Sequence, residues 1–170
     1  RVDAANDERS LRIEYRPIPT QPTVADVIGM QALVAGALRG LVGADHPITE
    51  LPWSAAESSF YNAVEDGLDA ELAWVTADGE RTDDTGIIFE ELFEHARSGL
   101  EAAGVPPDDV DGYLSPIEGR WRERTTPSSW KKGRVRDALD GGADLAGAIE
   151  AMQREYIARS READAFVGWL

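Results

Sequence analysis

The chain has 170 residues and a formal net charge of −15, because 32 Asp and Glu residues outnumber 17 Lys and Arg residues. A surface of this sign repels phosphates, which argues against a nucleic-acid or anionic-membrane partner. The absence of cysteine excludes disulfides, thiolate metal sites and cysteine nucleophiles. Scarce lysine and abundant aspartate predict a halophilic protein, since at about 1 M salt the Debye length is about 3 Å and acidic groups repel one another less.

No segment has the pattern of a signal peptide, and no apolar run is long enough to span a bilayer without interruption, so we expect a cytoplasmic protein. The first residue is Arg rather than Met, which predicts that the chain is the C-terminal part of a larger protein. No repeat and no internal linker is apparent. We therefore expect residues 1–170 to form a single domain.

The first predicted element is a strand over residues 11–16, where apolar and charged side chains alternate. After three prolines, Thr23 begins a helix with Asp26 three residues later, an arrangement like a capping box. Apolar residues recur along it at helical spacing: Val24, Val27, Ile28, Val34, Leu38, Leu41 and Val42. Met30, Leu33 and Ala37 widen this stripe, so we expect this helix to be the most buried one. Three of its glycines are expected to let another backbone approach closely: Gly29, Gly36 and Gly40.

A second helix is predicted from Ser54 to about Asp66, and Glu57 would complete a capping box with Ser54. Gly67 is expected to end it. Three apolar residues of this helix are expected to face the core: Phe60, Ala63 and Val64.

Residues 70–76 are a weak strand candidate followed by a turn at Asp78-Gly79, and residues 81–85 are too polar for a convincing hairpin partner. Amphipathic patterns and start signals predict four more helices: residues 87–103, one from Ser115-Pro116, one from Thr126-Pro127 and residues 144–166. The predicted fold class is therefore α+β and mainly α-helical, with about six helices and a small antiparallel sheet.

The first candidate for chemistry is the pair Glu14 and Arg16, which share one face of the predicted strand about 7 Å apart. A carboxylate suits Mg²⁺, and a guanidinium suits a phosphate oxygen. Together they could hold opposite ends of a magnesium nucleotide. A half-exposed strand can also carry such a pair only as a cross-face ion pair.

The second candidate is a basic cluster that contains both lysines: Arg120, Arg122, Arg124, Lys131, Lys132, Arg134 and Arg136. These residues are either a solvated surface that offsets Glu118, Glu123 and Asp137, or an anion-facing surface for ATP or a substrate carboxylate. Arg124, Lys131 and Lys132 are favoured for the second role. The two histidines have no metal-ligand spacing, so we expect ordinary surface or boundary roles for both.

Residues 11–42, LRIEYRPIPTQPTVADVIGMQALVAGALRGLV, resemble the type 2 glutamate–cysteine ligases, a family of carboxylate–amine ligases. Members have a strand with an apolar-Glu-apolar-Arg pattern, a short loop and a long apolar helix. Residues 60–70, FYNAVEDGLDA, resemble the family's helix ending in Gly-Leu-Asp, and the turn at residues 124–132 comes in the family's order. The chain departs from the family at Pro17-Ile18-Pro19, at Glu65-Asp66 and within the turn at residues 124–132, which lacks the family's glycines and its Arg-Gln-Arg-like run.

The resemblance implies a glutamine-synthetase-like catalytic fold that uses ATP and Mg²⁺, with Glu14 as metal ligand and Arg16 at the transferred phosphoryl group. Arg16, Arg124, Lys131 and Lys132 would bind ATP. The implied reaction phosphorylates an amino-acid carboxylate and then joins it to an amine. The other metal ligands would come from a sheet region upstream of this chain, so the chain would not be active alone. The alternatives are a non-catalytic helical interaction or scaffold module and a self-associating chain.

Overall fold

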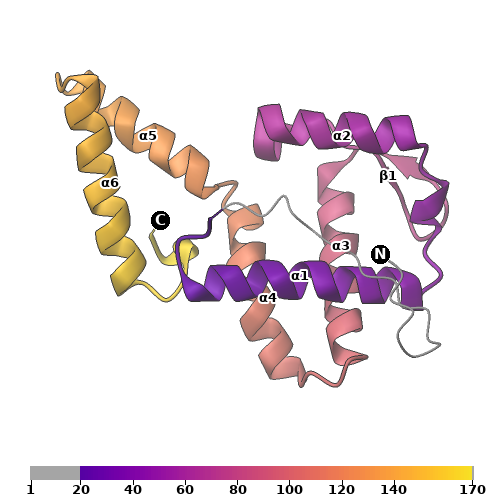
Figure 1. Cartoon of the computed structure of the whole chain (residues 1–170). Helices are drawn as coiled ribbons and strands as arrows, with labels where there is room; N and C mark the ends of the chain where they lie inside the picture. Colours follow the sequence, from indigo (N-terminus) through magenta and orange to yellow (C-terminus); the bar gives the residue numbers. More distant parts are fainter. Residues whose placement is uncertain (1–19, 170) are drawn as a thin grey trace, which may run out of the picture.

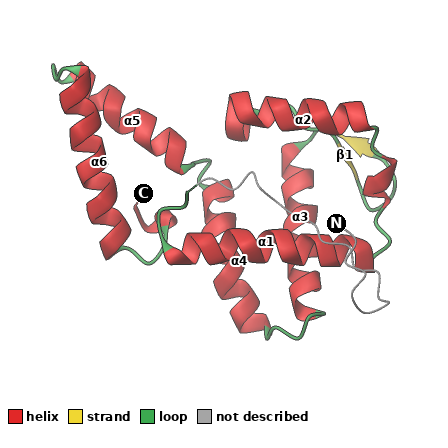
Figure 2. Ribbon diagram, in the orientation of Figure 1, coloured by secondary structure: helices red, strands yellow, loops and turns green. Residues whose placement is uncertain are grey.

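The computed structural model describes residues 20–169 (Figures 1 and 2). Its helices are α1 (Val24–Gly43), α2 (Trp53–Asp66), α3 (Thr85–Glu101), α4 (Pro107–Arg122), α5 (Pro127–Asp140) and α6 (Leu145–Glu162). The short elements are β1 (Trp74–Val75), β2 (Arg81–Thr82) and the 3-10 turns η1 (Pro47–Glu50), η2 (Gly67–Asp69) and η3 (Phe166–Trp169). The predicted mainly helical α+β class with a small antiparallel sheet is confirmed. The predicted strand at residues 11–16, with Glu14 and Arg16, lies outside the described residues.

The main core lies where α1 crosses α3 and α4 (Figure 1). Thr23 caps α1 as predicted, because its hydroxyl oxygen accepts the backbone N–H of Asp26 at 3.2 Å. Burying apolar side chains between these helices contributes about 25 cal/mol per Å² removed from water. The buried members of this cluster are Leu33, Ala37, Phe93, Ala96, Val110, Leu114 and Ile117.

Glycines bring α1 into backbone contact with its two neighbours. A Cβ atom on Gly36 would overlap the backbone of α3, and one on Gly40 would lie 2.7 Å from the carbonyl carbon of His95. A Cβ atom on Gly29 would lie 2.8 Å from the carbonyl oxygen of Tyr113 in α4. The predicted close approach of another backbone at these three glycines is therefore confirmed.

The prediction that α1 buries its large apolar residues is wrong for most of them. Val24 and Val42 are 74% and 77% exposed, and Val27, Ile28 and Leu38 are exposed as well. The contact face instead holds Gly29, Gly36, Ala37 and Gly40 with one larger apolar residue, Leu33, and only Leu33 and Ala37 of the predicted stripe are buried. An uncovered apolar stripe remains along α1.

Helix α2 departs from its prediction in a similar way. It ends before Gly67 as expected, but Pro52 precedes its first residue, and no side chain caps it in place of the predicted Ser54. No residue of α2 is buried, so Phe60, Ala63 and Val64 do not face the core. Periodicity predicted the helix correctly and did not determine what its apolar face contacts.

The two short strands correct a further prediction. β1 pairs antiparallel with β2, with Trp74 opposite Thr82, so residues 81–85 do contain the hairpin partner. The chain reverses at the predicted turn, where Gly79 has φ 82° and the N–H of Thr76 donates to the carbonyl of Glu80 at 2.8 Å. A ladder this short depends on backbone hydrogen bonds and on the turn, so the polar side chains did not prevent it.

Helix α4 begins earlier than predicted. Its first residue is Pro107, and Pro116, which was expected to start the helix, lies inside it and is buried. Proline at the first helical position loses no hydrogen bond, so the Pro106-Pro107 pair both ends the preceding loop and starts α4. The next helix, α5, starts at Pro127 as predicted, with a capping box between Thr126 and Ser129.

Among residues 20–169, α1 is the one helix long and apolar enough to cross a bilayer, by length and composition alone. Core helices of soluble proteins meet the same criterion, and 33% of the apolar window of α1 is buried against the rest of the fold. The expectation that no membrane is a partner stays a prediction.

The helix crossing gives a direct test. We expect Gly40→Ala to lower the free energy of unfolding by about 3 kcal/mol, because its Cβ would meet the backbone of α3 and cannot be accommodated by side-chain movement. The matched control is Gly133→Ala in α5, where a Cβ meets nothing within 4 Å; it should raise stability by about 0.5–1 kcal/mol. Urea unfolding measures both, and equal effects would contradict the assigned crossing.

Candidate functional site

Arg120 and Asp26 form a buried ion pair, with 2.7 Å between Nη2 and Oδ1. Asp26 lies in the first turn of α1 and Arg120 in the last turn of α4. The second oxygen of Asp26 accepts the hydroxyl of Thr23 at 2.8 Å and the backbone N–H of Phe166 at 3.0 Å. Nη1 of Arg120 donates to the side chain of Gln21 at 2.7 Å. These hydrogen bonds compensate part of the desolvation cost of the two charges.

The ion pair anchors the C-terminal part of the chain. The guanidinium carbon of Arg120 lies 5.3 Å from the ring centroid of Phe166, which forms a second apolar cluster with Tyr156 and Trp169. Burial raises the pKa of the Tyr156 hydroxyl above its usual value; the charge of Arg120 opposes this shift, and that of Asp26 adds to it. Through these contacts α6 and η3 are held against the first turn of α1.

We expect Arg120→Met to lower the free energy of unfolding by about 3–5 kcal/mol, because it leaves the Asp26 carboxylate buried without a counter-ion. Adding Asp26→Asn should recover more than half of this loss, since the neutral amide can still accept the N–H of Phe166. Urea unfolding of the single and double variants measures the coupling between the two sites. As a control, Arg154→Met breaks the exposed pair with Glu150 and should cost about 0.5 kcal/mol or less. If the two buried substitutions changed the unfolding free energy additively, the assigned Asp26–Arg120 ion pair would be contradicted.

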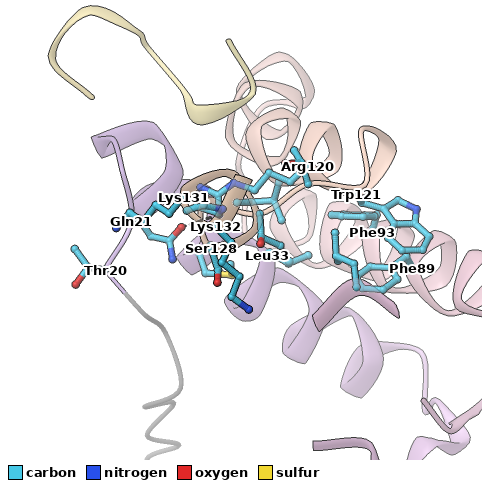
Figure 3. A pocket seen from close by; sticks show the side chains of 16 residues that line it. Thr20, Gln21, Leu33, Phe89, Phe93, Arg120, Trp121, Ser128, Lys131 and Lys132 are labelled. Atoms are coloured by element: carbon cyan, nitrogen blue, oxygen red, sulfur yellow. Dashed lines mark hydrogen bonds between the residues drawn. The ribbon is translucent and has the colours of Figure 1, made fainter. Parts of the chain in front are cut away.

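A cavity of about 600 Å³ opens beside this ion pair (Figure 3). Three stretches that are far apart in the sequence line it: Thr20 and Gln21 before α1, Leu68 in η2, and residues 125–128 with Lys131 and Lys132 at the start of α5. Its volume lies within the range of small-molecule sites, about 300–1,000 Å³.

One end of the cavity is aromatic. Phe89 of α3 stacks on Trp121 of α4 with ring centroids 4.1 Å apart, and Phe93 lies one turn further along α3. Figure 3 shows these three side chains together, away from the lysines and Gln21. The aliphatic part of the lining is Met30, Leu33, Leu68 and Ile117. This end therefore offers apolar contact and few polar groups.

The other end is cationic. Nζ of Lys131 lies 3.9 Å from the ring centroid of Tyr156, and Lys132 is exposed beside Ser128. Within residues 20–169 no ion pair involves either lysine, although acidic residues greatly outnumber basic ones. The structure thus brings two of the sequence-predicted anion-binding residues, Lys131 and Lys132, to one cavity.

Arg124, the third residue favoured from the sequence, does not line this cavity. Its Nη2 donates to the carbonyl of Leu68 and to Oδ1 of Asp69, both at 2.7 Å, and its guanidinium lies over Trp121 at 4.9 Å. Its backbone is left-handed, with φ 50°, the conformation that ends many helices. Arg124 therefore joins η2 to the end of α4, and its charge is already compensated by Asp69.

Other members of the basic cluster also have acidic partners. Arg122 lies 4.0 Å from Glu118, and Arg134 lies 3.2 Å from Glu155. The interpretation of the cluster as a charge-offsetting surface therefore holds for these arginines; Glu118 was a predicted partner, whereas Glu155 on α6 was not. Four arginines of the cluster, Arg120, Arg122, Arg124 and Arg134, therefore have acidic partners, and the two lysines line the cavity.

A polar cluster around His46 was not predicted from the sequence. His46 is buried, and its ring centroid lies 4.8 Å from that of His95, although 49 positions separate them in the chain. Its Nδ1 accepts the N–H of Ile48 at 3.1 Å, and its Nε2 lies 3.5 Å from Glu91. Glu91 also accepts the indole N–H of Trp74 at 2.7 Å. No sequence spacing indicated this meeting of η1, β1 and α3.

Glu91 makes stability depend on pH. Burial raises the pKa of its carboxyl, but the N–H groups of Ala77 and Trp74 and the neighbouring His46 lower it more, so the net pKa lies below the usual value of 4.5. A lowered folded-state pKa gives stability that is present above pH 4.5 and is lost as pH falls through the folded value.

We therefore expect the difference in unfolding free energy between the wild type and Glu91→Gln to be largest above about pH 5 and to shrink toward pH 3. Thermal unfolding across this range measures it. The control is Glu90→Gln on the exposed side of the same turn of α3, which should show no such trend. A constant difference from pH 3 to 7 would contradict the lowered pKa.

Within residues 20–169, no group of three or more His, Asp or Glu side chains is placed to hold a metal ion. The described residues alone therefore do not fit the Mg²⁺ implied by the resemblance, and Glu14, the predicted ligand, lies outside them.

No protein family, no curated protein and no solved structure matched this chain. A functional assignment therefore depends on the geometry of the cavity and on the short motifs that carry the resemblance.

Proposed function

We propose that this chain is part of an ATP-dependent carboxylate–amine ligase of the glutamate–cysteine ligase type. One observation supports this most: the 600 Å³ cavity is lined by parts of all three stretches that carry the resemblance. These are Thr20 and Gln21 within residues 11–42, Leu68 within residues 60–70, and residues 125–128 with Lys131 and Lys132 within residues 124–132. Convergence of three separate stretches on one cavity is what a shared site requires.

Position along the chain adds support. Arg16 comes only four positions before Thr20 in the sequence. The resemblance would add Arg16, the predicted phosphate-binding residue, to the two lysines of the cavity, Lys131 and Lys132. Three cations together could attract a nucleotide and an acid, although the chain carries a net charge of −15.

In the proposed reaction, a carboxylate oxygen attacks the γ-phosphorus of ATP, the bond to the bridging oxygen breaks, and ADP leaves. An amine nitrogen then attacks the acyl carbon, inorganic phosphate leaves, and the nitrogen loses a proton. The lysines would serve by neutralising the negative charges that must approach each other in the first step, which lowers its barrier.

The test is ADP formation from isotope-labelled ATP by the intact protein in molar KCl with Mg²⁺, an acid and an amine. We expect the double variant Lys131→Ala/Lys132→Ala, and separately Glu14→Ala and Arg16→Ala, to lower the rate at least about tenfold, because each removes a group that compensates phosphate charge. Arg161→Ala, an exposed cation in the last turn of α6, is the matched control and should leave the rate unchanged. Wild-type rates in the Glu14 and Arg16 variants would overturn the proposal.

A second candidate, a helical interaction module, is favoured by the aromatic face of α2. Trp53 is 80% exposed, and Phe60, Tyr61 and Val64 are exposed on the same side at helical spacing. Apolar surface of this kind marks contacts with other proteins, including a second copy of the chain. In the same samples, absence of nucleotide binding together with a dimeric mass by light scattering would favour this candidate over the ligase.

A further inference from the structure

The cavity has two chemically different ends. Stacked aromatic rings of Phe89 and Trp121 form one, and the side chains of Lys131 and Lys132 line the other. A ligand that fills both ends needs a flat apolar body and an anionic head. Neither end alone defines a ligand, but their combination in one 600 Å³ space does.

We infer that the cavity takes an organic acid with an aromatic side chain, its ring against Phe89, Phe93 and Trp121 and its carboxylate at Lys131 and Lys132. This inference rests on the proposed function, in which the same lysines serve the acid substrate, and it names the chemical class of that substrate.

The apolar end selects against polar ligand bodies. Its side chains offer one polar group, the indole N–H of Trp121, among Met30, Leu33, Phe89, Phe93 and Ile117. An adenine edge, a ribose or a second carboxylate placed there would lose hydrogen bonds to water without replacement, at about 1–3 kcal/mol for each buried group. An aromatic ring loses no hydrogen bond and gains stacking and burial.

The cationic end favours a ligand that carries a negative charge close to the two lysines. Arg120 also borders the cavity, but its guanidinium is paired with Asp26, so it adds little net charge. Lys131 and Lys132 are the two cations of the lining without an ion pair in the part of the chain that the structure describes. In a protein of charge −15, these two groups distinguish an acid from an uncharged molecule of the same shape.

Isothermal titration calorimetry of the intact protein tests the inference with 3-phenylpropionate, its alcohol 3-phenylpropanol and glutamate, in molar KCl without nucleotide. We expect the aromatic acid to bind at least about tenfold more tightly than either of the others, because only it uses both ends. In Lys131→Ala/Lys132→Ala the ratio of acid to alcohol affinity should fall to about one, while Arg161→Ala keeps the wild-type ratio.

An unchanged acid-to-alcohol ratio in the lysine variant, tighter binding of glutamate, or no binding of the aromatic acid would overturn the inference. Its failure is separable from that of the proposed function. Binding of 3-phenylpropionate with no ATP turnover for any acid would support the cavity ligand and remove the ligase. Lysine-dependent ATP turnover stimulated only by polar acids would support the ligase and remove the aromatic acid.

Discussion

Asp26 and Arg120 meet where three parts of the chain converge: the first turn of α1, the last turn of α4 and the C-terminal turn η3. Burying two charges costs several kcal/mol for each ion, and their attraction offsets this only with good geometry and further hydrogen bonds. Here Thr23, Gln21 and the N–H of Phe166 provide those bonds. The cavity is consequently fixed on one side by an interaction that tolerates little displacement.

This constraint connects the fold to the site. The pair holds η3 and, through the Tyr156–Phe166–Trp169 cluster, helix α6, against which α5 packs. Lys131 and Lys132 lie on α5. Their distance from the aromatic end of the cavity therefore depends on how α5 packs against α6. The close crossing of α1 and α3 at Gly36 and Gly40 fixes the opposite wall of the cavity. Helix α3 carries Phe89 and Phe93, and it cannot shift along α1 without backbone overlap.

Local signals in the sequence predicted most of the elements, and tertiary packing decided what they contact. The Thr23 cap, the turn at Gly79 and the start of α5 depend on nearby residues alone, and each was predicted correctly. The outward face of α1 was wrong because hydrophobic periodicity measures where apolar residues lie, whereas packing here is governed by where side chains are absent, at Gly36 and Gly40. The start of α4 was predicted wrongly at Pro116, because in the sequence a buried proline within a helix resembles a proline at a helix start.

The candidate site was predictable only in part, for the same reason. Lys131 and Lys132 could be found because they are the only lysines of an acidic chain. Nothing local distinguished them from Arg124, whose partner Asp69 lies 55 positions away, or indicated that His46 would meet His95. Aromatic residues of α3 and α4 were recognisable as apolar, but their role as a cavity wall depends on the crossing with α1.

At the molar salt predicted by the composition, the two lysines would contribute unequally to binding an anion. With a Debye length of about 3 Å, salt screens the exposed ammonium of Lys132 strongly and that of half-buried Lys131, 3.9 Å over Tyr156, much less. Apolar association does not weaken in the same way, because salt does not screen it. The aromatic end would thus supply most of the affinity at high salt, and Lys131 most of the selectivity for a charged head, so single substitutions of the two lysines should differ more as salt rises.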